Sequence, residues 1–382
     1  MKLIDCDANA TYAPDDDILD LFREALSCLS NPSSMHRAGQ RAKSAIEKAR
    51  AELLEAVCAH QDDTVVFTSG ATESNNMLPG LLPSATSQVV VHSFEHPCVL
   101  ATFKRHEERS PGTVTVLTPD SSGRISIDSV VRSLSAKTKL VSLMGANNET
   151  GALYPLAELC QAVKAAFPHV LVHCDAAQML GKERLSFAEL EVDAMTLSGH
   201  KIGALPGVGA LVLRKGLHID PIIVGGSQEM KLRGGTENVP AICIFSEVAK
   251  RVVSSLATRV QSMRAARDAF ESELSSRCKR VSINFVDLPR LPNTSSVLVD
   301  GVRGDDLVVA LDLAKVLAST GAACSSGKRE PSHVLLAHGF TEQEAASSVR
   351  FSFRADASAD DGREVATRFI EVIERFTKSE AA

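Results

Sequence analysis

The positions in this sequence best suited to chemistry are polar residues that directly follow short apolar runs. Asp175 closes the run VLVHCD, and Lys201 follows the run VDAMTLS. A partly buried carboxylate either caps the next turn or faces a cationic group, and a lysine with a desolvated amine can form a Schiff base. The turn SGAT at 69–72 joins the run TVVFT to a helix-compatible segment, where free N–H groups are either capped or bind an anion.

Two further positions of this kind carry an amide and an imidazole. Asn148 lies in GANNETG, which suits a turn but also allows a hydrogen bond to a ring substituent. His92 and His96 have the spacing of a metal pair, but Pro97 opposes a helix there and no third ligand is evident. We therefore expect no metal, and His96 is a candidate for stacking on a ring or moving protons.

The set of positions is more informative than any one of them, because each alone has an ordinary structural interpretation. In chain order, an anion cradle is followed by an acid and then by a lysine. These are the parts that hold pyridoxal phosphate: the cradle binds the phosphate, the carboxylate keeps the pyridine nitrogen protonated, and the lysine forms the Schiff base.

The elements that must position these residues alternate between strand-like and helix-like segments from about residue 34 to about 250. Near-continuous apolar runs such as QVVVHS, KLVSLMG and GALVLR predict a parallel sheet covered on both faces. Ligands of such sheets bind beyond the carboxyl ends of the strands. From about residue 251 one long charged helix through 278 leads into a smaller α+β unit.

Composition limits the classes of function. The chain has 382 residues, 44% hydrophobic residues and a net charge of −6, with no basic block, so we expect a globular protein that does not bind nucleic acid directly. No apolar run approaches the roughly 18 residues that span a bilayer, and the N-terminus lacks a signal peptide. Nine cysteines without a C-x-x-C pair predict neither a zinc site nor disulfides, which suits the cytoplasm.

On these motifs the chain resembles the cysteine desulfurase family, a class V aminotransferase group of fold type I pyridoxal phosphate enzymes. The resemblance covers nearly the whole chain and includes CDANATYAP, FTSGATESNN, EHPCVL, NNETGALYPL, HCDAAQMLGK, LSGHK, GGSQEMKLRGGTENVP and GAACSSGKREPSHVL. It implies an α/β fold with a mainly parallel seven-stranded sheet in a large domain at 16–250. A smaller α+β domain would combine 1–15 with 251–382.

The resemblance also implies roles for individual residues. Lys201 would carry the cofactor as a Schiff base, and Arg350 and Asn31 would hold the substrate carboxylate. Thr236 would reach the cofactor phosphate of a partner subunit, which implies a homodimer. The other implied cofactor-binding residues are Ala71, Thr72, His96, Asn148, Asp175, Gln178, Ser198 and His200.

Cys324, in ASTGAACSSGKREPSH at 318–333, receives an explanation from the same resemblance. Its thiol would take sulfur from L-cysteine, release alanine, and pass the sulfur to an acceptor protein. Small neighbours bury little surface, so we expect this segment to be mobile. Lys328 and Arg329 either favour the thiolate or are solvated.

Two segments depart from the family pattern, ALPG at 204–207 and Phe353-Arg354-Ala355. They leave substrate preference open between a cysteine desulfurase, a selenocysteine lyase, and a transaminase or β-lyase for another amino acid. A non-catalytic sulfur-carrier scaffold is a further alternative. The acceptor could belong to iron–sulfur cluster assembly, tRNA thiolation or another pathway.

Overall fold

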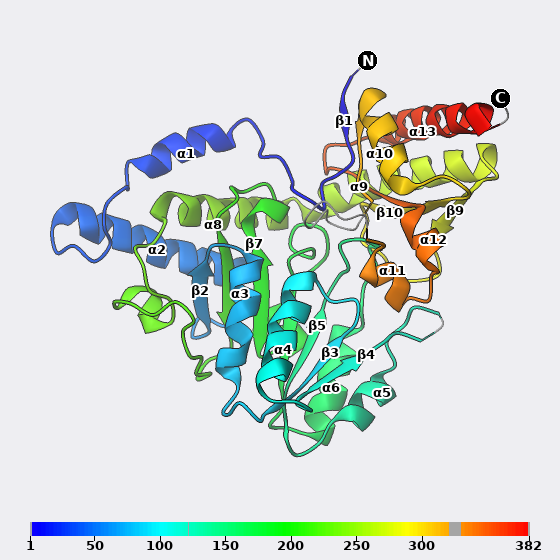
Figure 1. Cartoon of the computed structure of the whole chain (residues 1–382). Helices are drawn as coiled ribbons and strands as arrows, with labels where there is room; N and C mark the ends of the chain where they lie inside the picture. The colour runs from blue at the N-terminus through cyan, green and yellow to red at the C-terminus, as the bar shows by residue number, and fades with distance from the viewer. Residues whose placement is uncertain (1, 121, 321–329, 381–382) are drawn as a thin grey trace.

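A seven-stranded sheet forms the centre of the molecule (Figure 1). The computed structural model describes residues 2–120, 122–320 and 330–380, with the backbone alone described at 377–380. The strand order is β2-β8-β7-β6-β5-β3-β4. In chain order the strands are β2 (Thr64–Thr68), β3 (Gln88–His92), β4 (Val114–Leu117), β5 (Thr138–Met144), β6 (Leu171–Asp175), β7 (Ala194–Ser198) and β8 (Gly209–Leu213).

The sheet is mainly parallel, as the apolar runs predict. Only β8 runs against its neighbours β2 and β7, and the other neighbouring strands are parallel. A connection of ten residues at 199–208 joins β7 to β8, which suits an antiparallel pair but is too short for a crossover. The carboxyl ends of β3, β5, β6 and β7 therefore meet at one edge, where the predicted site residues lie.

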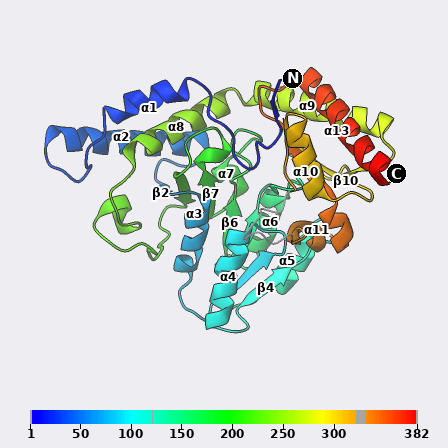
Figure 2. The same cartoon turned by 45° about the horizontal axis from the view of Figure 1, so that its top comes forward.

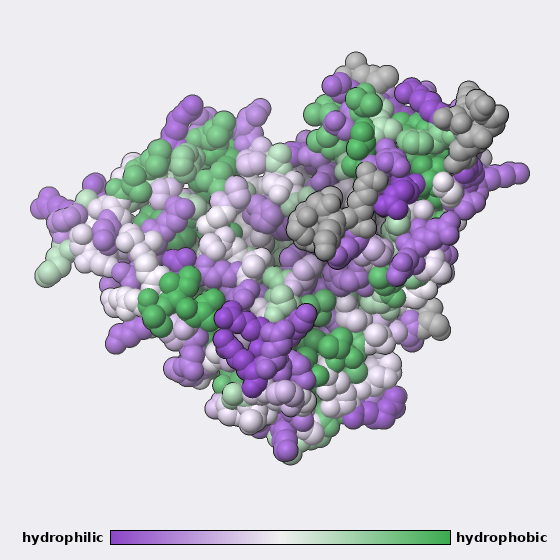
Figure 3. Space-filling view, viewed as in Figure 1, coloured by the Kyte–Doolittle hydropathy of each residue, from purple (hydrophilic) through white to green (hydrophobic). Residues whose placement is uncertain are grey.

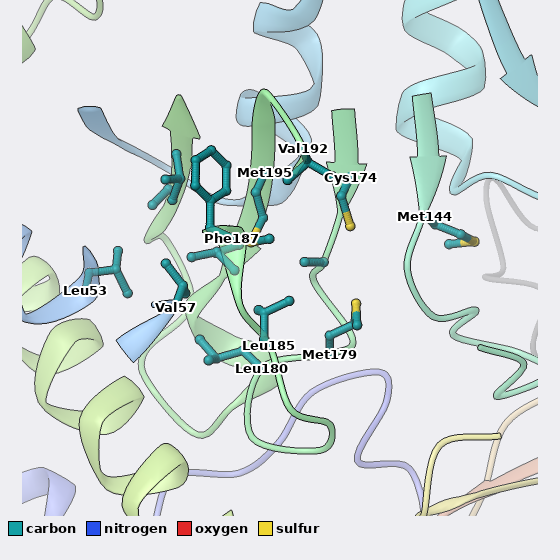
Figure 4. Packing of buried hydrophobic residues seen from close by; sticks show 14 of the residues in the cluster. Leu53, Val57, Met144, Cys174, Met179, Leu180, Leu185, Phe187, Val192 and Met195 are labelled. Atoms are coloured by element: carbon teal, nitrogen blue, oxygen red, sulfur yellow. The ribbon is translucent and has the colours of Figure 1, made fainter. Parts of the chain in front are cut away.

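Helices cover both faces of the sheet, which explains why its central strands carry apolar residues on both faces. In β2, Val65 and Phe67 belong to one hydrophobic core and Val66 to the other. Figure 4 shows side chains of the first core, among them Leu53 of a covering helix and Met195 of β7. The covering helices are α2 (Arg37–Ala56), α3 (Ala71–Met77), α4 (Pro97–Arg109), α5 (Ile127–Ser133), α6 (Leu156–Ala166), α7 (Phe187–Leu190) and α8 (Val239–Ser254).

A separate hydrophobic core lies under the C-terminal elements. Helices α9 (Leu256–Arg277) and α13 (Ala359–Glu380) lie side by side in both views (Figures 1 and 2). They cover a three-stranded antiparallel sheet of order β12-β10-β9. The strands are β9 (Val281–Asn284), β10 (Thr294–Val299) and β12 (Ser348–Ser352), and the remaining helices are α10 (Gly304–Leu313), α11 (His333–Ala337) and α12 (Glu342–Ala346).

The N-terminus belongs to this second part of the molecule. Strand β1 (Ile4–Asp5) pairs in parallel with β11 (Val316–Leu317), and Cys6 packs in the same core as Phe351. The chain then crosses to the larger part, where α1 (Ile18–Leu26) packs on α8. This course is compatible with the expected pairing of 1–15 with the C-terminal segment.

The structure differs from the single long helix expected near 251–278. The helix breaks at Ser255, whose φ and ψ are −102° and 10°, and whose hydroxyl donates to the Arg251 carbonyl. Val252 before the break packs in the first core, whereas Ala266 beyond it packs in the core of the C-terminal elements. The break therefore lets the chain pass between two cores, which local periodicity does not reveal.

A buried ion pair closes the outer edge of β2. Glu229 of the short helix η3 (Gln228–Lys231) is 4% exposed, and its carboxylate accepts the Phe67 N–H at 2.8 Å and both Nη groups of Arg50 at 3.1 and 3.2 Å. Residues 229–231 all have left-handed backbone conformations, with φ of 42°, 57° and 69°. Such conformations cost free energy in residues other than glycine, so Glu229 holds a strained segment against the sheet.

Two short 3₁₀ helices complete the chain as described, η1 (Leu78–Leu81) and η2 (Gly199–Lys201). In the ranges given above, no helix is long and apolar enough to cross a membrane.

Candidate active site

A cavity of about 500 Å³ lies beyond the carboxyl ends of the central strands. Its walls come from the first turn of α3, the start of α4, and the segments that follow β5, β6 and β7. Nine residues singled out from the sequence line it together: Ala71, Thr72, His96, Asn148, Asp175, Gln178, Ser198, His200 and Lys201. The fold thus gathers positions that are up to 130 residues apart in the chain.

Lys201 ends η2, directly after β7. Its amine donates to the backbone carbonyls of Asn9 and Ala10, both at 2.7 Å. Burial, together with the positive charge of Arg350, lowers the pKa of Lys201 from 10.5 to about 8, although Asp7 and Asp175 oppose the shift. A substantial part of the amine is therefore unprotonated near neutral pH, the form that attacks a carbonyl group.

Asp175 ends β6 and is 5% exposed. Its Oδ1 accepts the Ala177 N–H at 3.0 Å, and its Oδ2 accepts an Asn75 Nδ2–H at 2.7 Å. The carboxylate lines the cavity and retains free acceptor capacity, since each oxygen has two lone pairs. It is therefore suited to bind a protonated ring nitrogen.

A chain of buried hydrogen bonds stands behind Asp175. Asn75 in α3 accepts the Thr196 hydroxyl at 2.8 Å, and Thr196 lies 3.0 Å from His173 Nε2. His173 Nδ1 lies 2.9 Å from the Ser142 hydroxyl, and burial lowers the pKa of this histidine to about 4. When His173 is neutral and carries its proton on Nε2, each hydrogen bond from Ser142 to Asn75 has one donor and one acceptor. These hydrogen bonds fix the orientation of the Asn75 amide toward Asp175.

Sequence reasoning missed these supporting residues. His173 and Thr196 lie inside the apolar runs VLVHCD and VDAMTLS, where they interrupt the strands without ending them. Burying a polar side chain inside such a run costs free energy unless it has a hydrogen-bond partner. The presence of His173 and Thr196 in these runs was therefore the one sign in the sequence of a buried polar network. The identity of the partners required the register of β5, β6 and β7.

The turn between β2 and α3 forms an open cradle. Gly70 has a φ of 153°, and a β carbon added to it would meet nothing within 4 Å. A β carbon on Gly209 of β8 would lie 2.6 Å from the Gly70 Cα, so the close approach of the two segments requires glycine at 209, whereas the φ of Gly70 favours glycine at 70. The N–H groups at the start of α3 border the cavity together with Ser198 and His200. This arrangement fits a phosphate group.

Glu73 and Arg233 form an ion pair beside the cradle. Glu73 Oε2 accepts the Ser69 N–H at 2.8 Å, and Arg233 Nε donates to Oε1 at 2.9 Å. These hydrogen bonds lower the pKa of Glu73 although its burial acts in the opposite direction. Arg233 thus balances the carboxylate that would otherwise repel an anion at this helix start.

His96 caps the N-terminus of α4 and lines the cavity. Its Nδ1 accepts the Cys98 N–H at 3.2 Å. Burial lowers the pKa of His96, and nearby Asp175 opposes the shift. Burial raises the pKa of the neighbouring Cys98 thiol to about 12, so this thiol remains protonated near neutral pH. His96 is thus a neutral aromatic ring at the cavity wall.

The structure does not bring every predicted residue to the cavity. Arg350 of β12 is 5% exposed and lies behind it, donating to the Asn148 carbonyl at 3.0 Å and to Asp7 at 2.5 Å. Asn31 is exposed and accepts the Ser33 N–H at 2.9 Å in a turn before α2. Thr236 is exposed in the segment between η3 and α8. Their expected roles remain predictions.

Cys324, Lys328 and Arg329 lie outside the described residues. Ser319, which precedes them, forms a backbone pair with Arg350, and the chain resumes before His333 of α11. The segments that depart from the family pattern are both ordered. Pro206 and Gly207 border the cavity, and the Arg354 guanidinium lies 4.5 Å from the centre of the Tyr12 ring.

The donor set of the cavity fits pyridoxal phosphate. It combines an amine of lowered pKa, a carboxylate held by two donors, an open turn with free N–H groups and a neutral imidazole. In the described part of the chain, no group of three His, Cys, Asp or Glu side chains could hold a metal ion.

Comparison with known proteins agrees with this geometry. The family description "Aminotransferase class-V" matches residues 6–363, so the chain belongs to the class V aminotransferase family. A cysteine desulfurase of a Nostoc species is 35% identical over 378 residues, covering 97% of this chain and 94% of that relative. Within the class V family the chain therefore groups with the cysteine desulfurases.

Further comparisons support the same grouping. A cysteine desulfurase of Gluconacetobacter diazotrophicus is 37% identical over 374 residues, covering 95% of this chain and 92% of the relative. A solved NifS-like protein has a TM-score of 0.89 at 30% identity, covering 98% of this chain and 99% of its own. The predicted family and fold class are thus confirmed.

Proposed function

We propose that this protein is a pyridoxal phosphate-dependent desulfurase that converts L-cysteine to L-alanine and transfers the sulfur to an acceptor protein. The observation that carries the proposal is the single cavity in which Lys201, Asp175 and His96 converge around an open anion cradle. Membership of a family whose compared relatives are named cysteine desulfurases supports the choice of substrate.

Each wall of the cavity has a proposed task. Lys201 binds the cofactor through its unprotonated amine, and the turn at 69–72 binds the phosphate with Ser198 and His200. Asp175 holds a proton on the pyridine nitrogen, and Asn148 and Gln178 contact the ring oxygen. When bound, the cofactor stabilises negative charge that develops at the substrate α-carbon. His96 orients the ring and is positioned to move protons near it.

The substrate carboxylate is assigned to Arg350, whose guanidinium is suited to a bidentate contact. One of its Nη groups is held by Asp7 and the other by the Asn148 carbonyl. These contacts hold the cation close to the cavity, and a substrate carboxylate would compete with Asp7 for it. Asn31 would approach only after a change in the segment before α2, or from another subunit.

The sulfur step is assigned to Cys324. Its thiolate attacks the substrate sulfur, an S–S bond forms, and the carbon–sulfur bond breaks with its electron pair remaining on carbon. Protonation of that carbon gives alanine, and the enzyme retains a persulfide. The reaction of one cysteine with one enzyme thiol thus yields one alanine and one persulfide, without an external oxidant. The persulfide sulfur then passes to the acceptor.

A homodimer would complete the site. Thr236 is exposed and absent from the cavity of its own chain, as expected for a residue that serves a partner subunit. The preceding segment exposes apolar side chains: Ile222, Ile223, Val224 and Met230. Figure 3 shows apolar groups on the side of the molecule where η3 lies. Exposed apolar surface next to Thr236 supports an interface there.

The proposal is tested by incubating the purified protein and pyridoxal phosphate with L-cysteine and a reducing thiol. We expect equal amounts of alanine and sulfide, lost in Cys324→Ala and retained in Cys58→Ala, which removes an exposed thiol that does not line the cavity. Alanine formation by Cys324→Ala at the wild-type rate would refute the persulfide role. Turnover of selenocysteine or another amino acid alone would favour the alternative activities, and failure to bind the cofactor would exclude catalysis.

A further inference from the structure

A second lysine lies buried beneath the cavity. Lys182 follows β6 and is only 2% exposed. The chain enters this position through Gly181, whose φ of 75° and close approach to Val252 require glycine. The left-handed turn at Gly181 directs the next side chain into the protein, between the loop after β6 and the N-terminal segment. A fully buried lysine is rare, because removing its ammonium group from water is costly.

Lys182 has amide oxygens as its partners. Its amine donates to the side-chain oxygen of Asn9 at 2.8 Å and to that of Gln178 at 2.5 Å. Both of these partners in the described ranges are uncharged amides rather than carboxylates. Burial lowers the pKa of Lys182 well below its ordinary value, and the charges of Lys201 and Arg350 act in the same direction. A neutral amine has two N–H groups, which match the two acceptors.

Lys182 determines which way the Gln178 amide faces. Oε1 of Gln178 accepts from Lys182, so its Nε2 is directed to the Asn9 backbone carbonyl, to which it donates at 3.0 Å. The same carbonyl accepts the Lys201 amine at 2.7 Å. The Lys182 amine therefore fixes the Gln178 amide and, through it, the Asn9 carbonyl, and both of these groups lie next to Lys201.

Asn9 extends this network to the C-terminal elements. Its side-chain oxygen accepts from Asn293 as well as from Lys182, and its Nδ2 donates to Thr294 and to the Asn148 carbonyl. Asn9 is 1% exposed, and all its polar atoms are engaged. Loss of the Lys182 donor would leave Gln178 Oε1 without its partner and remove one of the two side-chain contacts to Asn9 Oδ1.

We propose that Lys182 is a positioning residue for the cofactor site, acting through Gln178 and Asn9 to fix the amide donor and the carbonyl that surround Lys201. The proposal rests on the proposed function, because the amide and the amine are the groups assigned to the cofactor. It assigns Lys182 no contact with substrate or cofactor. A purely structural lysine would contribute to folding but not to the properties of the bound cofactor.

The test compares Lys182→Met, Gln178→Ala and the double variant with wild type. The dissociation constant of pyridoxal phosphate is measured by fluorescence on apoprotein, and the pH midpoint of the cofactor absorption band on the loaded enzyme. We expect Lys182→Met to weaken binding about tenfold, the effect of one lost buried hydrogen-bond partner, and to move the pH midpoint by about half a unit. When Gln178→Ala is already present, Lys182→Met should raise the dissociation constant by less than about threefold.

Lys164→Met is the matched control. The Lys164 amine donates to Asp193 at 2.6 Å and to the Val170 carbonyl at 2.8 Å, at the amino ends of β6 and β7, so its loss affects stability away from the cavity. If Lys182→Met yields no folded protein, Lys182→Gln retains one donor and should weaken binding less than tenfold but measurably.

Four outcomes decide the interpretation. A tenfold loss of pyridoxal phosphate affinity in Lys182→Met that largely disappears in the Gln178→Ala background supports the proposal. A variant that only melts at a lower temperature, with wild-type affinity and pH midpoint, overturns it, as does full additivity with Gln178→Ala. Failure of the wild-type protein itself to bind pyridoxal phosphate would instead refute the proposed function.

Discussion

The lowered pKa of Lys201 gives a prediction that can be measured without the cofactor. The perturbation is pH, applied to the apoprotein, and the quantity is the fraction of the Lys201 amine that is unprotonated. This fraction rises with pH and reaches one half at about pH 8, because burial and the Arg350 charge lower the pKa from 10.5 to about 8. An ordinary lysine reaches the same point only near pH 10.4.

The size of the effect follows directly. At pH 7.5 a pKa of about 8 leaves roughly a quarter of the Lys201 amine unprotonated. An exposed lysine has about 0.1% in that form, so Lys201 should be about 200-fold richer in reactive amine. The difference corresponds to about 3 kcal/mol between the two protonation states.

Competitive labelling with a trace of acetic anhydride measures this fraction for every lysine at once. The apoprotein is labelled at a series of pH values, and the modification of each lysine peptide is read by mass spectrometry against the unfolded protein. Lys215 is the internal control, since it is exposed and its hydrogen bond to Asp62 raises its pKa. We expect the reactivity of Lys201 to be half-maximal near pH 8 and that of Lys215 above pH 10.

A variant separates the two causes of the lowered Lys201 pKa, burial and the charge of Arg350. Arg350→Met removes the nearby positive charge but leaves Lys201 buried, so the Lys201 midpoint should rise only part of the way toward its ordinary value. A Lys201 midpoint that coincides with that of Lys215 would refute the reasoning. A midpoint unchanged in Arg350→Met would refute the contribution of the arginine.

Two further predictions concern the edge of the sheet and the subunit arrangement. Glu229→Ala leaves Arg50 buried without its partner and should cost about 3–5 kcal/mol of unfolding free energy in chemical denaturation. Glu189→Ala breaks an exposed pair and should cost far less, so equal costs would contradict the role of Glu229 at the edge of the sheet. Lys201→Ala and Thr236→Ala protomers, each inactive alone, should regain activity when refolded together, because one site of the mixed dimer is then wild type. Absence of recovery in a mixed dimer of verified composition would show that Thr236 does not serve the partner's site.

The cavity-lining residues could be predicted because each follows an apolar run. Asp175 and Lys201 end adjacent parallel strands or the turns after them, so the topology alone brings them to one edge. The buried support of these residues could not be predicted in the same way. Lys182 and Asn9 meet only after β6 and the N-terminal segment have been placed, 173 residues apart in the chain.

The fold of the larger part could also be predicted from the sequence, but its junction with the C-terminal part could not. Helical periodicity continues through Ser255, so the chain offered no local sign that the helix breaks there. The reason for the break is the change of core between Val252 and Ala266, which depends on tertiary packing. Likewise, the short β4 at the sheet edge lacks a long apolar run, because two of its residues are exposed.

The placement of the first ten residues has a consequence for synthesis. The Asn9 and Ala10 carbonyls bind Lys201, and Cys6 accepts the Ser352 N–H at 2.7 Å, so the segment reaches its final position only after β12 has been made. At about 10 residues per second the ribosome needs roughly half a minute for that distance. Residues 6–10 therefore cannot form all of these contacts until β12 has been synthesised. A nascent chain stalled before β12 would contain Lys201 but could not hold the Asn9 and Ala10 carbonyls in place to accept its amine.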